Sequence, residues 1–365
     1  MPFPPGSASQ DGSMGTLTLC MINYNGEAYL ERSLSAALAQ RPRCQELLLV
    51  DSASADSSIS LIARRFPDVR IVRLDRNGGP AAARNEGFRA ASCDRILFLD
   101  GDMILPEDLA ARLGAALDAD PDAAVAVPRV LYADAPNIVQ FDGAECHFLG
   151  GMTLHHAGWH DRDVPAHTRR VGSLGTGCFL VDRQRLGVSQ PFDESFLFNY
   201  EDHDFGVGTR LRGREILAVS SARCRHLHGT PGLSLRPGGR YASLRVYCLI
   251  RNRWLVLLKY FQWQTLLLLA PMLFAYELAQ LATVIAKGWL PEWARAVGWI
   301  VRHLPAILGR RRAVQQERRV PDRELLSGGP LPFREELTPT PLQRTAKAAL
   351  DRLAVGYWQL VMRLV

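Results

Sequence analysis

Two aspartates that flank a glycine are the feature of the sequence best suited to chemistry. Asp100-Gly101-Asp102 directly follows Ile96-Leu97-Phe98-Leu99, an apolar run typical of a buried central strand. Two carboxylates at the end of one strand can approach a single hard cation. Mg²⁺ and Mn²⁺ prefer such oxygen ligands and keep positions open for phosphate oxygens. An isolated Asp-x-Asp is more often a solvated turn, so this interpretation depends on the motifs around it.

Polar residues also end two earlier strand-like runs. The first run ends in Asn23-Tyr24-Asn25-Gly26, and Asp51 follows Leu47-Leu48-Leu49-Val50. A carboxylate at Asp51 can accept hydrogen bonds from a ribose hydroxyl or a base N–H. Tyr24 can stack on a nucleobase, although an ordinary packed tyrosine explains it nearly as well. These positions favour a nucleotide ligand. Because the first run is not followed by the glycine-rich dinucleotide fingerprint, NAD is disfavoured.

Two glycine-containing turns offer places for phosphate or sugar groups. Asn77-Gly78-Gly79-Pro80 opens a helical stretch whose first N–H groups suit a phosphate, and Arg84 adds a positive charge. Gly175-Thr176-Gly177 precedes another strand-like run and indicates a second loop of this kind. A plain tight turn explains both glycine turns equally well.

An acidic pair and two histidines supply candidates for proton transfer and further metal ligation. Glu201 and Asp202 are two candidate general bases for an acceptor hydroxyl, and a solvated helix start is the alternative. His226 and His228 are two residues apart, on one face of a strand. One imidazole could ligate the metal or contact a diphosphate, whereas a lone histidine is more often structural.

In combination, these motifs resemble those of the family 2 inverting glycosyltransferases with the GT-A fold, over roughly residues 17–259. The runs Tyr200 to Asp204 and Arg251-Asn252-Arg253 also resemble the bacterial rhamnosyltransferase-like branch. The resemblance implies that Asp202, ahead of Glu201, is the general base. It implies a divalent metal, Mg²⁺ or Mn²⁺, whose ligands are Asp100, Asp102 and either His226 or His228. It implies donor contacts from Tyr24, Asn25, Asp51, Gly79, Arg84, Asp100 and Gly177.

The elements that must position these residues alternate between short strands and helices. The predicted strands are Thr16 to Ile22, Glu46 to Val50, Arg70 to Leu74, Arg95 to Leu99 and Ala123 to Val127. The predicted helices are Glu27 to Gln40, Ser57 to Arg65, Pro80 to Ala91 and Pro106 to Leu117. Such alternation predicts an α/β fold with a mostly parallel central sheet, whose ligands bind at the carboxyl ends of the strands.

The chain then becomes less regular. Gln140 to Arg170 predicts long functional loops, Ser173 to Val181 a strand, Glu201 to Arg212 a helix, and Glu215 to His228 a pair of short strands. The predicted organisation is a disordered N-terminus (1–15), a GT-A catalytic domain (16–240), a helical membrane-associated region (241–320) and a tail with an amphipathic helix (321–365). Within the catalytic domain we expect a nucleotide-binding half at about 16–130 and an acceptor half at about 131–240.

The C-terminal third combines apolar and basic character. The net charge of +6 is matched by the segment from Lys287 to Arg319, which holds eight Lys or Arg against two Glu. Leu266 to Ala286 is long enough to span a bilayer, with Glu277 as its one charge. Trp289, Trp293 and Trp299 suit a lipid interface, on which the basic run would contact anionic headgroups. We expect membrane attachment, through a span or an interfacial hairpin; a soluble packing or dimerisation subdomain is the alternative.

Cysteines and the N-terminus indicate the compartment. The seven cysteines are scattered without a Cys-x-x-Cys pair, which is typical of a reducing environment and disfavours a thiolate zinc site. The first residues carry no secretory signal pattern. We therefore expect the protein at the cytoplasmic face of the plasma membrane.

The function predicted from the sequence is inverting, metal-dependent glycosyl transfer in cell-envelope glycan synthesis. The donor would be a UDP- or dTDP-linked sugar and the acceptor a lipid-linked or polysaccharide glycan. A nucleotidyltransferase acting on sugar phosphates is one alternative, but it usually has a glycine- and lysine-rich loop after the first strand. A basic nucleic-acid-binding protein is another, and the carboxylates at the strand ends would repel its phosphates. We expect no nucleic-acid partner.

Overall fold

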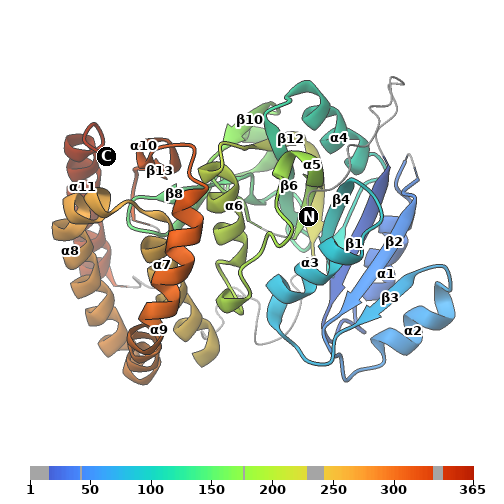
Figure 1. Ribbon diagram of the computed structural model, residues 1–365, viewed down its shortest axis with the longest axis horizontal. Coiled ribbons are helices and arrows are strands. Elements are labelled where there is room, and N and C mark those ends of the chain that lie inside the picture. Colours follow the sequence, from blue (N-terminus) through green and yellow to red (C-terminus); the bar gives the residue numbers. More distant parts are fainter. Residues whose placement is uncertain (1–15, 42, 176, 228–241, 332–339) are drawn as a thin grey trace.

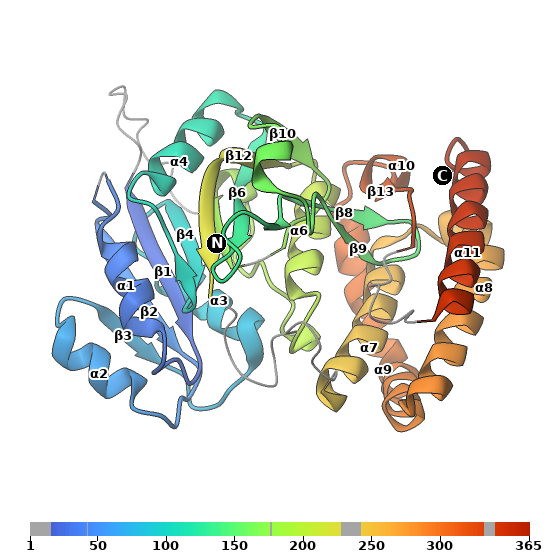
Figure 2. The same ribbon diagram turned by 180° about the vertical axis from the view of Figure 1, so that it is seen from behind.

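The computed structural model describes residues 16–41, 43–175, 177–227, 242–331 and 340–365. The predicted disordered segment 1–15 and the predicted ligand His228 lie outside the described residues. Figure 1 shows an α/β domain at one end of the molecule and a group of long helices at the other, and Figure 2 shows the same arrangement from behind.

A mainly parallel sheet forms the centre of the α/β domain. β1 (Leu17–Asn23) pairs in parallel with β2 (Glu46–Asp51) on one side and with β4 (Arg95–Asp100) on the other, and β3 (Arg70–Arg73) extends the sheet beyond β2. Past β4 the order continues with β11 (Cys178–Asp182), β6 (Ala123–Tyr132), β12 (Glu215–His226) and β10 (Thr168–Val171). Only β11 and β10 run antiparallel to their neighbours on this path. The predicted α/β fold with a mostly parallel sheet is confirmed.

Helices cover both faces of this sheet, which explains why its strands read as continuous apolar runs. Alternate residues such as Leu19 and Met21 of β1 pack with α1 (Leu30–Leu38), α2 (Ser58–Arg65) and α4 (Leu109–Ala119). The intervening residues, such as Cys20 of β1 and Phe98 of β4, pack with α3 (Gly79–Ala90), α5 (Arg183–Leu186) and α6 (Glu201–Leu211). The alternation follows from the two-residue period of a strand.

Two predicted stretches have a different structure. Glu215 to His226 forms one strand, β12, whose register shifts between Val219 and Arg223, so the predicted pair of strands is wrong. The stretch predicted as loops contains β7 (Val139–Phe141), β8 (Ala144–His147), β9 (Met152–Leu154) and a short 3-10 helix at Asp161–Asp163. These strands pair with each other, with β6 and with β13 (Leu326–Ser327). β7, β8 and β9 are only three or four residues long, which is too short to give a clear periodic signal in the sequence.

The C-terminal third packs against the α/β domain. α7 (Ser243–Tyr260), α8 (Trp263–Lys287), α9 (Leu290–Gln316), α10 (Asp322–Leu325) and α11 (Pro341–Val361) surround a second apolar core. This core includes Phe148, which follows β8, Val207 of α6 and Trp358 of α11. Because residues of α6 belong to both the first domain and this core, the helices help to fix the position of α6.

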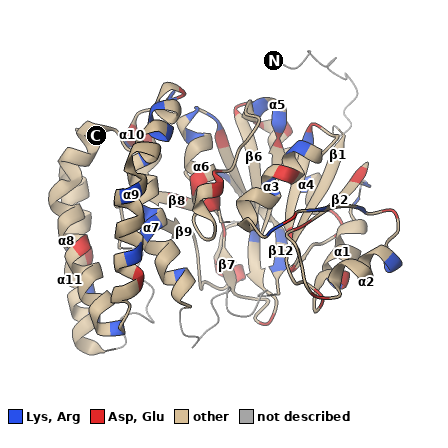
Figure 3. Ribbon diagram, turned by 60° about the horizontal axis from the view of Figure 1, so that its bottom comes forward, with Lys and Arg blue, Asp and Glu red and all other residues tan. Residues whose placement is uncertain are grey.

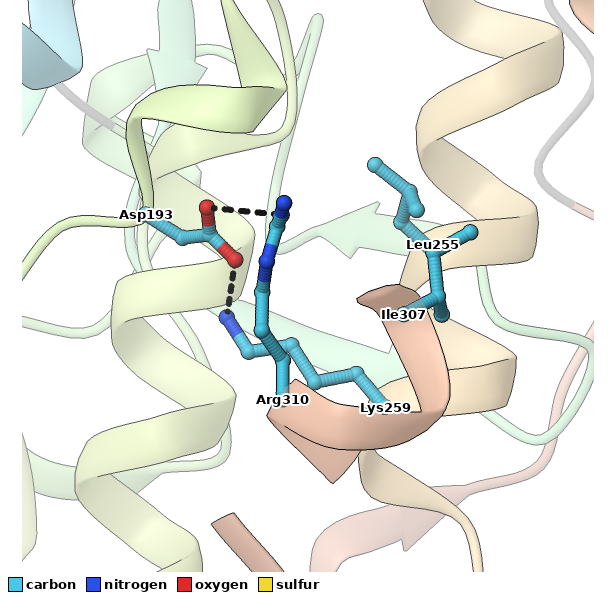
Figure 4. A pocket seen from close by; sticks show the side chains of 5 residues that line it. All are labelled: Asp193, Leu255, Lys259, Ile307 and Arg310. Carbon is cyan, nitrogen blue, oxygen red and sulfur yellow. Dashed lines mark hydrogen bonds and ion pairs between the residues drawn. The ribbon is translucent and has the colours of Figure 1, made fainter. Parts of the chain in front are cut away.

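Part of the basic run is held inside the protein instead of facing outward as predicted. Arg310 contacts Asp193 at 3.4 Å, and Asp193 also accepts a bond from Lys259 at 2.9 Å, beside a cavity of only about 10 Å³ (Figure 4). Arg311 is buried, donates to the carbonyl of Leu258 and stacks on Trp263. Arg311 is therefore not free to bind lipid headgroups, whereas the side chain of Arg310 is 41% exposed, and Arg312 and Arg319 are exposed as well.

Candidate active site

The strand register brings the polar motifs to one edge of the sheet. Asn23 at the end of β1 lies opposite Asp51 of β2, and Ile22 lies opposite Asp100 of β4. Asp51 is fully buried and accepts hydrogen bonds from Asn23 Nδ2 at 2.9 Å and from the Ser54 amide at 3.0 Å. Asp51 therefore shapes the loop after β2, and the predicted contact with base or ribose remains a proposal.

The residues after β1 complete this corner of the site. Asn25 has a left-handed backbone (φ 51°), and its side-chain oxygen accepts a bond from the Ala55 amide at 2.9 Å. Its own amide donates to Ser54 Oγ at 2.8 Å. Tyr24 is half-buried at the same edge. Asn25 thus ties the ends of β1 and β2 together, next to the tyrosine predicted to stack on a base.

The Asp-Gly-Asp motif lies beside His226. Asp102 Oδ2 is 2.9 Å from His226 Nε2, because β5 (Met103–Ile104) pairs with the end of β12. The other ring nitrogen, Nδ1, is 2.9 Å from Gln140 Oε1. Burial lowers the pKa of His226, but the hydrogen bond to Asp102 and the charges of Asp102 and Asp100 raise it more, so the pKa lies above its usual value.

This corner offers donor atoms of the kinds that a divalent cation takes, and two of them, on Asp102 and His226, are in contact. Because the Gln140 oxygen can only accept a hydrogen bond, the Nδ1 atom of His226 carries a proton and donates it to this oxygen. In the neutral ring, Nε2 then presents a lone pair to the Asp102 carboxylate. In the positively charged ring, Nε2 carries a second proton and donates to Asp102. A cation shared with Asp102 would replace that proton, and Asp100 adds a partly exposed carboxylate. Within the described part of the chain, however, no group of three or more His, Cys, Asp or Glu residues is arranged so that it could hold a metal ion.

Arg84, which we predicted to help bind the nucleotide, pairs with two carboxyl groups of the protein. It is 1% exposed, and its guanidinium donates to Asp100 Oδ1 at 2.8 Å and to Glu201 Oε1 at 3.3 Å. The rings of Phe179 and Phe192 lie 5.8 Å from it. Enclosed in this way, Arg84 links the metal motif to the acidic pair, and a direct contact with the nucleotide is not available to it in this conformation.

The two candidate bases have different surroundings at the start of α6, where acidic residues are visible in Figure 3. Glu201 is 5% exposed, and burial raises its pKa to about 7, with the charge of Asp202 adding to the rise and Arg84 opposing it. Asp202 is half-buried, and its Oδ1 accepts the amide of His203 at 2.7 Å. Glu201 is therefore committed to Arg84, whereas Asp202 retains access to solvent.

The remaining predicted residues form turns around this centre. Gly177 has a φ of 128°, and its carbonyl accepts the Asp100 amide at 2.8 Å. Gly79 has a φ of 84° at the start of α3, where a side chain would collide with the backbone of Leu197. Both positions require glycine, and Gly79 brings the predicted phosphate-binding turn against the segment that leads into Glu201.

Sequence reasoning did not assign roles to three residues that organise the site. Asn85 of α3 makes two hydrogen bonds with the backbone of Phe192. Arg251 and Asn252 of α7 donate to backbone carbonyls just before α6. The signal that could have identified the two α7 residues is the run Arg251-Asn252-Arg253 within a mainly apolar helix. Buried polar groups must have hydrogen-bond partners, so such a run indicates contacts with a neighbouring segment.

The chain is similar in sequence to known glycosyltransferases and proteins of polysaccharide biosynthesis. Residues 18–165 match the model of "Glycosyl transferase family 2". The succinoglycan biosynthesis protein ExoO of Rhizobium meliloti (strain 1021) is 36% identical over 213 residues, which are 57% of this chain and 56% of that protein. A poly-beta-1,6-N-acetyl-D-glucosamine synthase of Staphylococcus aureus (strain COL) is 32% identical over 94 residues, 25% of this chain and 23% of that protein. This chain thus spans about half the length of its first curated relative, and less of the other.

A solved structure shares the fold. The crystal structure of GalNAc-T7 with UDP, GalNAc and Mn2+ superposes with a TM-score of 0.50 at 17% identity, over 65% of this chain and 48% of that chain. At this identity the likeness concerns the fold alone. It confirms the predicted GT-A type of nucleotide-sugar-binding fold.

Proposed function

The chain belongs to glycosyl transferase family 2, and from this premise we propose that it transfers a sugar, with inversion, from a nucleotide-diphosphate sugar to a glycan acceptor of the cell envelope. Two sets of contacts support this proposal: Asp102 pairs with His226, and Arg84 joins Asp100 to Glu201, the residue before Asp202. In this proposal, the corner formed by Asp102 and His226 binds the cation, and the partly exposed Asp202 carboxylate faces the acceptor. A UDP- or dTDP-linked sugar remains the proposed donor, and a lipid-linked or polysaccharide glycan the proposed acceptor.

The part of each residue in this reaction follows from its surroundings. Asp202 takes the proton from the acceptor hydroxyl as that oxygen attacks the anomeric carbon. Arg84 pairs with the partly exposed Asp100 and the buried Glu201, so that these carboxyl groups can lie close to the base. Asp100, Asp102 and His226 would hold Mg²⁺ or Mn²⁺, which supplies positive charge for the departing diphosphate.

A donor screen tests the proposed function. Purified protein is incubated with UDP-, dTDP- and GDP-sugars, with and without Mn²⁺, and release of the nucleoside diphosphate is measured. We expect release from one class of donor, dependent on the metal and increased by an acceptor glycan. Release of pyrophosphate from a nucleoside triphosphate and a sugar phosphate would indicate a nucleotidyltransferase instead. No release from any donor would contradict the proposal.

We also propose that the protein attaches to a membrane through α8. Among the described helices, α8 alone is long and apolar enough to cross a bilayer, and 28% of its most apolar window is buried. Its inner face carries Glu277, which pairs with the buried Arg253 of α7. Its outer face is apolar, with Leu267 78%, Phe274 66% and Ile285 61% exposed. Glu277 therefore lies on the protein side and leaves the outer face free to enter lipid.

Charges placed on this outer face should release the protein from lipid. We expect the wild type to stay with anionic vesicles after a high-salt wash, because hydrophobic insertion is not screened by salt. The double variant Leu267→Glu/Leu278→Glu should move to the supernatant. Val301→Glu is the matched control, since Val301 is an exposed apolar residue of α9, 67% accessible, and should leave binding unchanged. A wild-type chain that is monodisperse without detergent and ignores vesicles would contradict membrane attachment.

A further inference from the structure

The backbone immediately before the acidic pair is strained. Leu197 has φ 54° and ψ −59°, and the amide of Phe198 donates to the carbonyl of Phe196 at 2.5 Å, which defines a γ-turn of the rare, strained kind. Asn199 and Tyr200 follow with φ values of 59° and 69°. Residues with side chains rarely adopt such angles, and they persist only where surrounding contacts impose them.

One set of these contacts comes from α7. Asn252 is fully buried, and its Nδ2 donates toward the carbonyls of Phe196 at 2.9 Å, Phe198 at 3.0 Å and Asn199 at 2.6 Å. A single amide therefore binds carbonyls on both sides of the γ-turn. Leaving these carbonyls without a donor in the interior would be unfavourable, so Asn252 favours the strained conformation over relaxed ones.

Arg251 fixes the direction of the Asn252 amide. Its Nε donates to Asn252 Oδ1 at 2.8 Å, which turns the NH₂ group toward the carbonyls. Its Nη2 donates to the carbonyls of Ser195 at 2.8 Å and Phe196 at 3.0 Å. The guanidinium lies between the rings of Tyr247 and Trp299, at 5.1 and 4.7 Å. Arg251 is thus rigidly placed: it adds a donor to the Phe196 carbonyl that Asn252 also binds, and it extends the contacts to the Ser195 carbonyl.

α3 holds the same segment from the other side. Asn85 binds both the carbonyl and the amide of Phe192, and Arg84 binds Glu201. Between these points, a Cβ on Gly79 would lie 1.9 Å from the carbonyl oxygen of Leu197, so the two backbones are in direct contact. Residues 192–201 are therefore fixed between α3 and α7, and Asp202 is the next residue along the chain.

We propose that Asn252 and Arg251 are positioning residues: they hold residues 195–200 in the strained conformation and thereby place the Asp202 carboxylate for proton transfer. This inference rests on the proposed function, since it takes Asp202 as the base. Neither α7 residue needs to touch a substrate. Loss of these hydrogen bonds would remove contacts that hold the γ-turn, and misplacement of a catalytic group by about 1 Å can reduce the rate by about 100-fold.

The test compares Asn252→Ala with a matched variant of the same helix. We expect Asn252→Ala to lower kcat by about 100-fold with donor KM nearly unchanged, and to speed amide hydrogen exchange in residues 196–202. Arg253→Gln is the control, because Arg253 is equally buried on α7 but donates to the Leu149 carbonyl and pairs with Glu277. It should lower stability without a selective loss of kcat.

Further arms separate the possible failures. Arg251→Lys keeps one donor and should retain more activity than Arg251→Ala. Wild-type kcat and unchanged exchange in Asn252→Ala would overturn the inference, as would an equal fall of kcat in Arg253→Gln. Asp202→Asn is measured in parallel. If Asp202→Asn stays fully active, Asp202 is not the base. Faster amide hydrogen exchange in Asn252→Ala would then show only a structural role for Asn252. Absence of transfer by the wild type would refute the proposed function, whatever the exchange data show.

Discussion

Asp202→Asn should lower kcat for sugar transfer by about 100- to 10,000-fold, the range for loss of a general base. Asparagine has nearly the same shape, and its side-chain oxygen can still accept the His203 amide that now donates to Asp202 Oδ1 at 2.7 Å. The start of α6 should therefore keep its structure. Because the base contacts the acceptor, donor KM should change little. Steady-state kinetics with donor and acceptor varied separately would measure both effects.

Glu201→Gln is the control that distinguishes the two acids. Burial raises the pKa of Glu201 to about 7, so the folded protein holds a proton that the unfolded chain releases above its ordinary pKa of 4.5. Glu201 therefore makes the fold less stable as the pH rises from about 4.5 to 7, and Glu201→Gln should remove this dependence. We expect it to retain more activity than Asp202→Asn. If Glu201→Gln is inactive while Asp202→Asn is not, the two roles must be exchanged.

The edge at which the site forms was predictable from the sequence alone. Asp51 and Asp100 each end an apolar run, and parallel strands separated by helices place such ends side by side. The register then puts Asp51 opposite Asn23, as this logic requires. The start of α6 at Glu201 was also predictable, because two acids in a first turn suit the helix dipole.

What the sequence could not provide are contacts that depend on tertiary packing. Arg84 and Glu201 are 117 residues apart, and no local pattern indicates that an arginine near a glycine turn will bind an acid on another helix. The strained residues Leu197 and Tyr200 are equally invisible, since the usual signal for left-handed backbone is glycine or asparagine. Such conformations arise from the surrounding contacts and not from the preferences of the residues themselves.

Asp102→Asn should nearly abolish transfer while leaving the fold intact. Asp102 is buried, and its Oδ2 faces His226 Nε2, whose other nitrogen bonds Gln140. The asparagine side chain keeps the volume but lacks the charge that a divalent cation needs from its ligands. Because such a cation contributes several kcal/mol to stabilising the leaving diphosphate, we expect a loss of about 1,000-fold or more in kcat.

A readout that does not depend on turnover makes this prediction decisive. Mn²⁺ together with UDP should raise the melting temperature of the wild type, because a ligand that binds only the folded state stabilises it, and Asp102→Asn should lose most of this increase. Asp163→Asn is a matched control, since Asp163 is a 57% exposed aspartate that pairs with the neighbouring Arg162, and it should respond like the wild type. A chelator should also suppress wild-type transfer.

Undiminished Mn²⁺ stabilisation of Asp102→Asn would exclude Asp102 as a ligand, and full activity in chelator would exclude a metal from the reaction. The pair of Asp102 and His226 would then be a structural link between β5 and β12, and the leaving diphosphate would have to be stabilised by the N–H groups at the start of α3.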